Sequence, residues 1–133
     1  MRILFVDDAI DSRELFGLFF EIQGHRAHLA CNGREAVAAV HEREVFDVIV
    51  MDVEMPQMDG WQAARAIRAL ERGQQVPLIL FTAYEAQEDY EKAAQAGANI
   101  LLRKPLLPDQ LLWHIDYCLT CASHTQADAE PDS

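Results

Sequence analysis

The sequence predicts an α/β fold in which short strands form a parallel sheet and alternate with helices. Four short, continuous apolar runs lie far apart in the chain, a pattern typical of strands buried on both faces of a parallel sheet. These runs are Ile3–Val6, Val48–Met51, Leu78–Phe81 and Ile100–Leu102. Segments with helical periodicity separate them, and a further segment of alternating polarity adds one strand. Repeated strand–helix units of this kind connect through right-handed crossovers.

The first helix is expected directly after the first strand. Its apolar stripe consists of Leu15, Phe19 and Ile22, with Phe16 and Phe20 beside it. Asp11 and Glu14 have the spacing of a capping pair, which places the start of the helix there. Gly24 stands where the same helix should end.

Residues 26–31 alternate in polarity and predict an edge strand, second in chain order, with one face toward water. One face carries Ala27, Leu29 and Cys31, and the other carries Arg26, His28 and Ala30. Asn32 and Glu35 again have the spacing of a capping pair, so a second helix begins there. Its apolar positions are Ala36, Val37 and Val40.

Three more helices follow the third, fourth and fifth strands. Asp59 can cap the third helix, and Pro108 suits the first turn of the fifth. Gly73 and Gly97 are placed to end the third and fourth helices. The inward positions are Ala64, Ile67 and Leu70 in the third helix, Tyr90, Ala93 and Ala94 in the fourth, and Leu111, Leu112, Ile115 and Leu119 in the fifth. The fourth helix is therefore short of large apolar residues.

The composition suits one domain and excludes several classes of function. The 133 residues carry 22 acidic and 11 basic side chains, a net charge of −11, which disfavours direct binding to nucleic acid or anionic lipid. No apolar run approaches the ~20 residues of a membrane span, and the first run is too short for a signal peptide. Three cysteines make no disulfide framework, so we expect a cytoplasmic protein. We place the folded domain at residues 1–122 and a disordered acidic tail at residues 123–133.

Polar side chains follow four of the five predicted strands. Asp7 and Asp8 follow the first strand, Asp52 the third, Thr82 the fourth and Lys104 the fifth. Each alone is more often a cap, a turn residue or a solvated charge. However, ligands of open α/β sheets bind outside the carboxyl ends of the strands, where these side chains should meet. Their coincidence predicts one functional site.

The chemistry of this cluster favours phosphoryl transfer. Three adjacent carboxylates repel one another unless a cation is present, and a site made of oxygen atoms suits Mg²⁺. A lysine ammonium and a threonine hydroxyl beside the metal can bind the oxygens of a transferring phosphoryl group. The remaining carboxylate can then act as the nucleophile and form an acyl phosphate.

The ordered set of these motifs resembles the receiver domain of two-component response regulators, from about Arg2 to about Leu119. The matching stretches are Ile-Leu-Phe-Val-Asp-Asp at 3–8, Val-Ile-Val-Met-Asp-Val-Glu-Met-Pro-Gln-Met-Asp-Gly at 48–60, Leu-Phe-Thr-Ala at 80–83, Gly-Ala at 97–98 and Lys-Pro at 104–105. The resemblance implies a flavodoxin-like (βα)5 fold with a five-stranded parallel sheet in the order 2-1-3-4-5. It also implies a single-domain switch that takes a phosphoryl group from a histidine kinase or a histidine phosphotransfer protein and then controls a protein partner. Such a protein catalyses only its own phosphorylation and slow dephosphorylation.

The resemblance also assigns roles to individual residues. Asp52 is the phosphoacceptor, and Mg²⁺ is held by Asp8, Asp52 and the main-chain carbonyl of Glu54, with Asp7 acting partly through water. Lys104 contacts a phosphoryl oxygen, and its peptide bond to Pro105 is expected to be cis. The switch residues are Thr82, Ala83, Lys104 and Leu101.

One switch residue departs from the usual receiver pattern, and two other residues near the site bear on how the switch works. Leu101 stands where many receivers have an aromatic residue that rotates on activation. Coupling through such a rotor is therefore put in doubt, whereas the phosphorylation chemistry is not. Tyr84, two residues after Thr82, is a candidate to respond to the phosphorylation state in place of that aromatic residue. Glu54 lies two residues after the acceptor, so its size and charge should influence how long the phosphate lasts.

Several alternatives remain beside this interpretation. The chain can be a receiver segment of a hybrid histidine kinase, or a pseudo-receiver that binds partners without phosphorylation. A phosphatase of the haloacid dehalogenase type also uses an aspartate nucleophile and Mg²⁺, but it needs a second aspartate where this chain has Glu54. A metal site at His114, Cys118, Cys121 and His124 is disfavoured, because ligands along one straight helix do not easily surround a tetrahedral ion.

Overall fold

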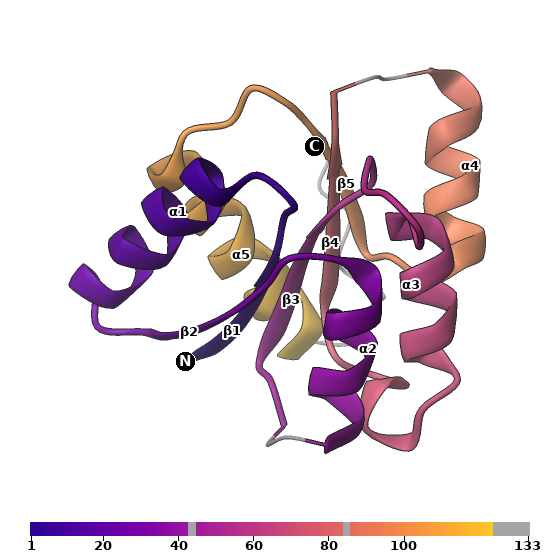
Figure 1. The fold of residues 1–133 in the computed structure, drawn as a ribbon, viewed down its shortest axis with the longest axis horizontal. Coiled ribbons are helices and arrows are strands. Elements are labelled where there is room, and N and C mark those ends of the chain that lie inside the picture. Colours follow the sequence, from indigo (N-terminus) through magenta and orange to yellow (C-terminus); the bar gives the residue numbers. More distant parts are fainter. Residues whose placement is uncertain (43–44, 84–85, 124–133) are drawn as a thin grey trace.

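The computed structural model describes residues 1–42, 45–83 and 86–123 and has a single parallel sheet at its centre. Its five strands lie in the order β2-β1-β3-β4-β5, which confirms the predicted topology (Figure 1). The strands are β1 Arg2–Val6, β2 Arg26–Ala30, β3 Val48–Asp52, β4 Leu78–Thr82 and β5 Ile100–Arg103. Each predicted strand is present, with ends shifted by no more than two residues.

The helices cover both faces of this sheet. They are α1 Ile10–Ile22, α2 Gly33–Glu42, α3 Gly60–Arg68, α4 Gln87–Ala96 and α5 Pro108–Ser123, with a short 3₁₀ helix, η1, at Glu71–Gly73. Helices α1 and α5 lie on one face, and α2, α3 and α4 lie on the other (Figure 1). This arrangement leaves the carboxyl ends of the strands open at one edge of the molecule.

The sheet divides the core into two apolar clusters, because successive strand residues point to opposite faces. Leu4, Ile49 and Leu80 belong to the cluster beneath α2, α3 and α4. Phe5 and Phe81 belong to the cluster beneath α1 and α5, and their ring centroids are 5.8 Å apart. Every residue of β3 and β4 is buried, which explains why both strands read as continuous apolar runs. Full burial of each large side chain contributes ~1.5–3 kcal/mol.

Helix α1 buries a different stripe from the one predicted. Leu15 and Ile22 are 56% and 70% exposed, whereas Phe16 and Phe20 are buried. The Phe16 ring stacks on Phe5 with 4.8 Å between the centroids, so the larger aromatic side chains take the inward positions. The predicted cap at Asp11 is also wrong, because the helix begins at Ile10 and Asp11 lies within the first turn.

Strand β2 and helix α4 depart from their predicted faces in a similar way. In β2, Ala30 is buried beneath α2 on the face that also carries Arg26 and His28, whereas Leu29 on the opposite face is exposed, so the wet and buried sides are not divided as predicted. In α4, Ala93 and Ala96 are buried, whereas Tyr90 and Ala94 are exposed. Helix α4 therefore lies on the core through two alanines alone.

Most of the predicted helix ends are confirmed. The Asn32 side chain accepts a hydrogen bond from the Glu35 amide, and Asp59 forms a capping box with Gln62. Gly24 and Gly97 have φ values of 91° and 92°, in the left-handed region that favours glycine. Gly73, however, ends η1 and not α3, because α3 stops at Arg68.

Arg68, the last residue of α3, connects two segments at the edge of the sheet opposite to the strand ends that carry the acidic residues: the segment before β4 and the turn between α4 and β5. Its guanidinium donates to the carbonyl oxygens of Gly97 at 2.7 and 2.9 Å, Gly73 at 2.8 Å and Val76 at 2.6 Å. It also donates to the side-chain oxygen of Asn99 at 3.2 Å. This single side chain therefore ties the end of α3 to the turn between α4 and β5.

Three other expectations concern the chain as a whole. The cysteines at 31, 118 and 121 are free, as predicted. Within the part of the chain that the structure describes, no helix combines the length and the apolar character that crossing a bilayer requires. Helix α5 continues through Ser123, and the rest of the predicted tail, from residue 124, lies outside the described residues.

Candidate functional site

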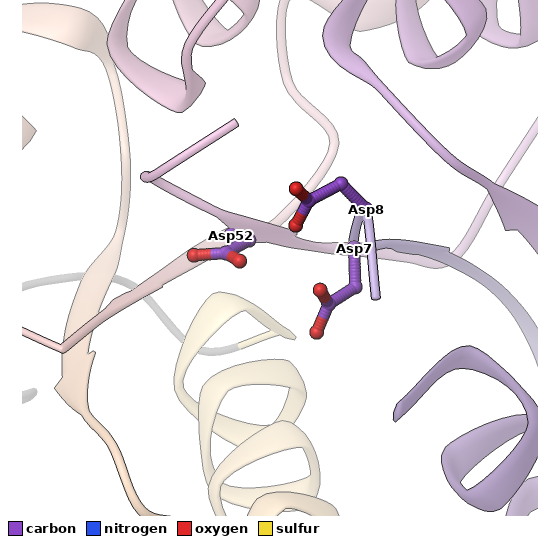
Figure 2. A group of neighbouring side chains, drawn as sticks. All are labelled: Asp7, Asp8 and Asp52. Carbon is purple, nitrogen blue, oxygen red and sulfur yellow. The ribbon is translucent and has the colours of Figure 1, made fainter. Parts of the chain in front are cut away.

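Three carboxylates meet at the open edge of the sheet. Asp7 and Asp8 directly follow β1, and Asp52 is the last residue of its neighbour β3 (Figure 2). One oxygen atom of each side chain lies within 4.8 Å of the others. Asp7 and Asp52 are only 2% and 1% exposed, whereas Asp8 is exposed at the surface. Among the described residues this is the one group of acidic, histidine or cysteine side chains close enough to share a metal ion.

Asp52 lies at the centre of the hydrogen-bonding network. Its Oδ2 atom accepts from the Lys104 ammonium at 2.9 Å, and its Oδ1 atom accepts from the Glu54 amide at 3.1 Å. Burial raises the pKa of Asp52, Lys104 lowers it, and the charge of Asp7 raises it, so that the pKa is raised from 3.8 to about 6. The carboxylate is therefore ionised at neutral pH, and its charge lowers the free energy of unfolding.

Lys104 reaches this carboxylate from the loop after β5. Its backbone amide donates to the carbonyl oxygen of Thr82 at 2.8 Å, which fixes the loop to the end of β4. Its ammonium also lies 5.1 Å from the centre of the Phe81 ring. Burial lowers the pKa of Lys104, but the carboxylate of Asp52 outweighs burial, so the pKa is raised and the ammonium is charged. The peptide bond to Pro105 is cis, as expected.

Thr82 is the last residue of β4, the neighbour of β3, and Ala83 follows it; both contact Glu54. The Thr82 hydroxyl donates to Oε2 of Glu54, and the Ala83 amide donates to Oε1 of the same carboxylate at 3.0 Å. Thr82 is buried, whereas Ala83 is exposed. Glu54 was predicted to contribute its main-chain carbonyl, and the contacts of its side chain were not foreseen.

The backbone around Asp7 is held by three hydrogen bonds. Its amide donates to the carbonyl oxygen of Ala30 at 3.1 Å, and its Oδ1 atom accepts from the Ala9 amide at 3.0 Å. The Arg13 guanidinium donates to its carbonyl oxygen at 2.8 Å. Asp7 therefore has a fixed orientation, and one of its oxygens is used within the loop.

The start of α3 fits closely against the end of β3. A Cβ atom on Gly60 would lie 2.5 Å from the carbonyl oxygen of Asp52, so only glycine allows this approach. The Gly60 amide donates to the carbonyl oxygen of Val53 at 2.9 Å. The loop that carries Glu54 is thus closed over the end of β3.

The site forms one side of a pocket of about 490 Å³ between α1 and the loop before α5. The acidic residues and Lys104 line it together with apolar side chains, among them Phe5, Phe16, Phe81, Leu106 and Leu111. Carboxylate oxygens beside open space suit a hard divalent cation that keeps some of its water. The Lys104 ammonium beside Asp52, and the Thr82 hydroxyl and Ala83 amide beside Glu54, are donors that suit an oxyanion.

Comparisons with known proteins agree with this geometry. The family model for the response regulator receiver domain matches residues 3–116. The chain belongs to the receiver domain family of two-component response regulators.

Similar sequences make up nearly the whole of one relative and a small part of another. A 14.6 kDa protein from Leptolyngbya boryana is 39% identical over 120 residues, which cover 90% of this chain and 91% of that protein. The regulatory protein AtoC of Escherichia coli (strain K12) is 39% identical over 113 residues, but these cover 83% of this chain and only 23% of AtoC. The chain therefore spans less than a quarter of AtoC.

Two solved receiver structures have the same fold. The chemotaxis response regulator CheY4 of Vibrio cholerae has a TM-score of 0.82 and 31% identity, covering 88% of this chain and 97% of that chain. The receiver domain of the sensor histidine kinase PA1611 of Pseudomonas aeruginosa has a TM-score of 0.80 and 34% identity, covering 90% and 97%. That structure holds a magnesium ion in its active-site cleft.

The remaining candidate residues of this receiver lie away from the acidic cluster. Leu101, on β5, is partly buried against the core cluster beneath α2, α3 and α4. Cys118 is buried with Leu111 and Ile115, which supports its interpretation as a core residue, and burial raises the pKa of its thiol. Tyr84 and His124 lie outside the described residues.

Proposed function

We propose that this receiver accepts a phosphoryl group on Asp52, with Mg²⁺ bound, and thereby changes its affinity for a protein partner. The observation that carries the proposal is the position of Asp52, buried between Asp7 and Lys104 at the edge of the pocket. The donor is a phosphohistidine of a histidine kinase or of a histidine phosphotransfer protein. The target is a protein and not a nucleic acid, in keeping with the net charge of −11.

In the proposed reaction, an Asp52 oxygen attacks the phosphorus atom as an ionised carboxylate. The O–P bond of the acyl phosphate forms while the N–P bond to the donor imidazole breaks, and the imidazole leaves with the bonding electron pair. A pKa of about 6 keeps Asp52 mostly ionised at neutral pH, so no separate base is needed. Lys104 neutralises part of the charge on the transferring oxygens.

Asp7, Asp8, Asp52 and the carbonyl oxygen of Glu54 are the proposed ligands of Mg²⁺. The three carboxylates present oxygen atoms within 4.8 Å of one another, which fits a hard cation. When bound, Mg²⁺ offsets the negative charge that the carboxylates and the phosphoryl oxygens share. Removing the exposed ligand Asp8 should therefore weaken Mg²⁺ binding strongly without disturbing the buried side chains.

The experiment compares phosphorylation of the wild type with that of Asp52→Ala. With Mg²⁺ and acetyl phosphate, the wild type should gain the mass of one phosphoryl group and Asp52→Ala should gain none. Asp116→Ala, which removes an exposed aspartate of α5, is the matched control and should be labelled like the wild type. Circular dichroism checks that each variant is folded.

Two outcomes would overturn the proposal. Equal labelling of Asp52→Ala would show that the acceptor lies elsewhere. A folded wild type that takes no label from acetyl phosphate or from any kinase of its organism would favour a pseudo-receiver that binds partners without phosphorylation. The chain is also similar to the histidine kinase BarA of Escherichia coli, at 34% identity over 111 residues. A receiver segment of a hybrid histidine kinase is therefore the second candidate function.

A further inference from the structure

Glu54 presents both oxygen atoms of its carboxylate to two donors at the end of β4. Oε2 accepts from the Thr82 hydroxyl, and Oε1 accepts from the Ala83 amide at 3.0 Å. Glu54 stands only two residues after the acceptor, and its own amide donates to Asp52 at 3.1 Å. An anion held by a hydroxyl and a backbone amide has the contacts expected of a bound phosphoryl group.

We infer that the Glu54 carboxylate is an internal ligand of the Thr82–Ala83 donor pair and must leave before a phosphoryl group on Asp52 can bind that pair. This inference rests on the proposed function, since it concerns the same phosphoryl group. It assigns to Glu54 a positioning role in which its side chain, and not its main chain, determines how readily the switch closes.

Competition follows from the number of protons available. A threonine hydroxyl has one proton to donate, and a backbone amide has one. While Glu54 accepts hydrogen bonds from both groups, a phosphoryl oxygen can form only weaker hydrogen bonds with them. Two anions bound to the same two donors would also repel each other, so the Glu54 carboxylate and the phosphoryl group do not share the donors.

Burial makes this competition effective. Thr82 is 2% exposed, so water has little access to its hydroxyl and competes weakly with an anionic acceptor. Glu54 is only partly buried and lies in the loop between β3 and α3, so its side chain can turn toward solvent. The phosphoryl group is the acceptor that takes its place.

The test measures the affinity of Mg²⁺-saturated protein for beryllofluoride, a mimic of the phosphoryl group, by NMR titration. Glu54→Ala should bind beryllofluoride about tenfold more tightly, the change expected if Glu54 occupies the donor pair about nine times in ten. Glu54→Asp keeps the charge but is one methylene shorter, so it should resemble Glu54→Ala. Glu88→Ala removes an exposed acid from the first turn of α4 and should resemble the wild type.

A second measurement needs no phosphoryl group. Without metal or beryllofluoride, the Ala83 amide should exchange with solvent faster in Glu54→Ala than in the wild type, because it has lost its acceptor. Unchanged exchange, or unchanged beryllofluoride affinity in Glu54→Ala, overturns the inference. If Glu54→Asp behaves like the wild type, charge alone is responsible and the inference is also wrong. Failure of the proposed function differs from these results, because the wild type itself would then bind no beryllofluoride.

Discussion

Replacing Asp52 with asparagine should make the metal-free protein more stable at pH 7, although it removes the proposed phosphoacceptor. Burial and the neighbouring Asp7 disfavour the charge of Asp52, and the 2.9 Å contact with Lys104 only partly compensates. Asparagine has nearly the same shape and no charge, and its side-chain oxygen can still accept from Lys104. The substitution therefore removes the electrostatic cost and keeps most of the packing.

The magnitude follows from the pKa of Asp52 in the folded protein, about 6, against 3.8 for an unperturbed aspartate. Because the folded value is the higher one, the folded state binds more protons between these limits, and stability falls as the pH rises from 3.8 to about 6. At pH 7 the full cost of ~3 kcal/mol is present. This cost already includes the favourable contact with Lys104, so an asparagine that resembles the protonated aspartate should raise the free energy of unfolding by up to ~3 kcal/mol.

Urea unfolding in the presence of a chelator measures this difference. The advantage of Asp52→Asn over the wild type should shrink by ~1 kcal/mol between pH 7 and pH 5, because the folded wild type regains most of its proton at the lower pH. Asp116→Asn, at an exposed position of α5, should show neither the gain nor the pH dependence. Saturating Mg²⁺ should reverse the order, since the wild type gains more from binding the ion.

An Asp52→Asn protein that is no more stable than the wild type at pH 7 would refute this reasoning. So would a gain that stays the same at pH 5, because it would have to come from packing and not from the charge.

Two further predictions concern the opposite edge of the sheet and the switch itself. Arg68→Met should lower the free energy of unfolding by ~2–4 kcal/mol, because three carbonyl oxygens lose a charged donor. Arg68→Lys should not restore the stability, and equal urea midpoints for the wild type and Arg68→Met would contradict this prediction. On adding Mg²⁺ and beryllofluoride, hydrogen exchange should change most in the segment after Thr82 and at the start of α4, where only Ala93 and Ala96 are buried in the helix. Large changes in hydrogen exchange around Leu101 and in α5, with unchanged exchange in α4, would contradict this prediction and show that Leu101 couples to the switch as an aromatic residue does.

The sequence was sufficient to locate the strands and the acidic cluster, because both depend on local patterns. The buried apolar runs fix the positions of the strands. Parallel pairing then brings Asp7 and Asp52 to the same edge of the sheet, independently of how the helices pack. The buried face of α1 could not be decided in this way. Two adjacent stripes of that helix are apolar, and the choice between Leu15 and Phe16 depends on the Phe5 ring across the core.

The contact between Glu54 and Thr82 could not be predicted for a related reason. It joins a loop residue to the last residue of β4, 28 positions further along the chain, and no spacing rule connects the two. A glutamate two residues after Asp52 was visible in the sequence, but whether its side chain points to solvent, to Lys104 or to Thr82 is decided by how the loops fold over β3.

The bonds of Arg68 have a consequence for the way α4 can move. Its guanidinium donates twice to the carbonyl oxygen of Gly97, directly after the last turn of α4, and so fixes that end of the helix to α3. The other end begins at Gln87, close to the switch, and the helix between is buried only through small side chains. We therefore expect a displacement of α4 that starts beside Thr82 to be largest at Gln87 and smallest near Ala96, so that the helix tilts about the end that Arg68 holds.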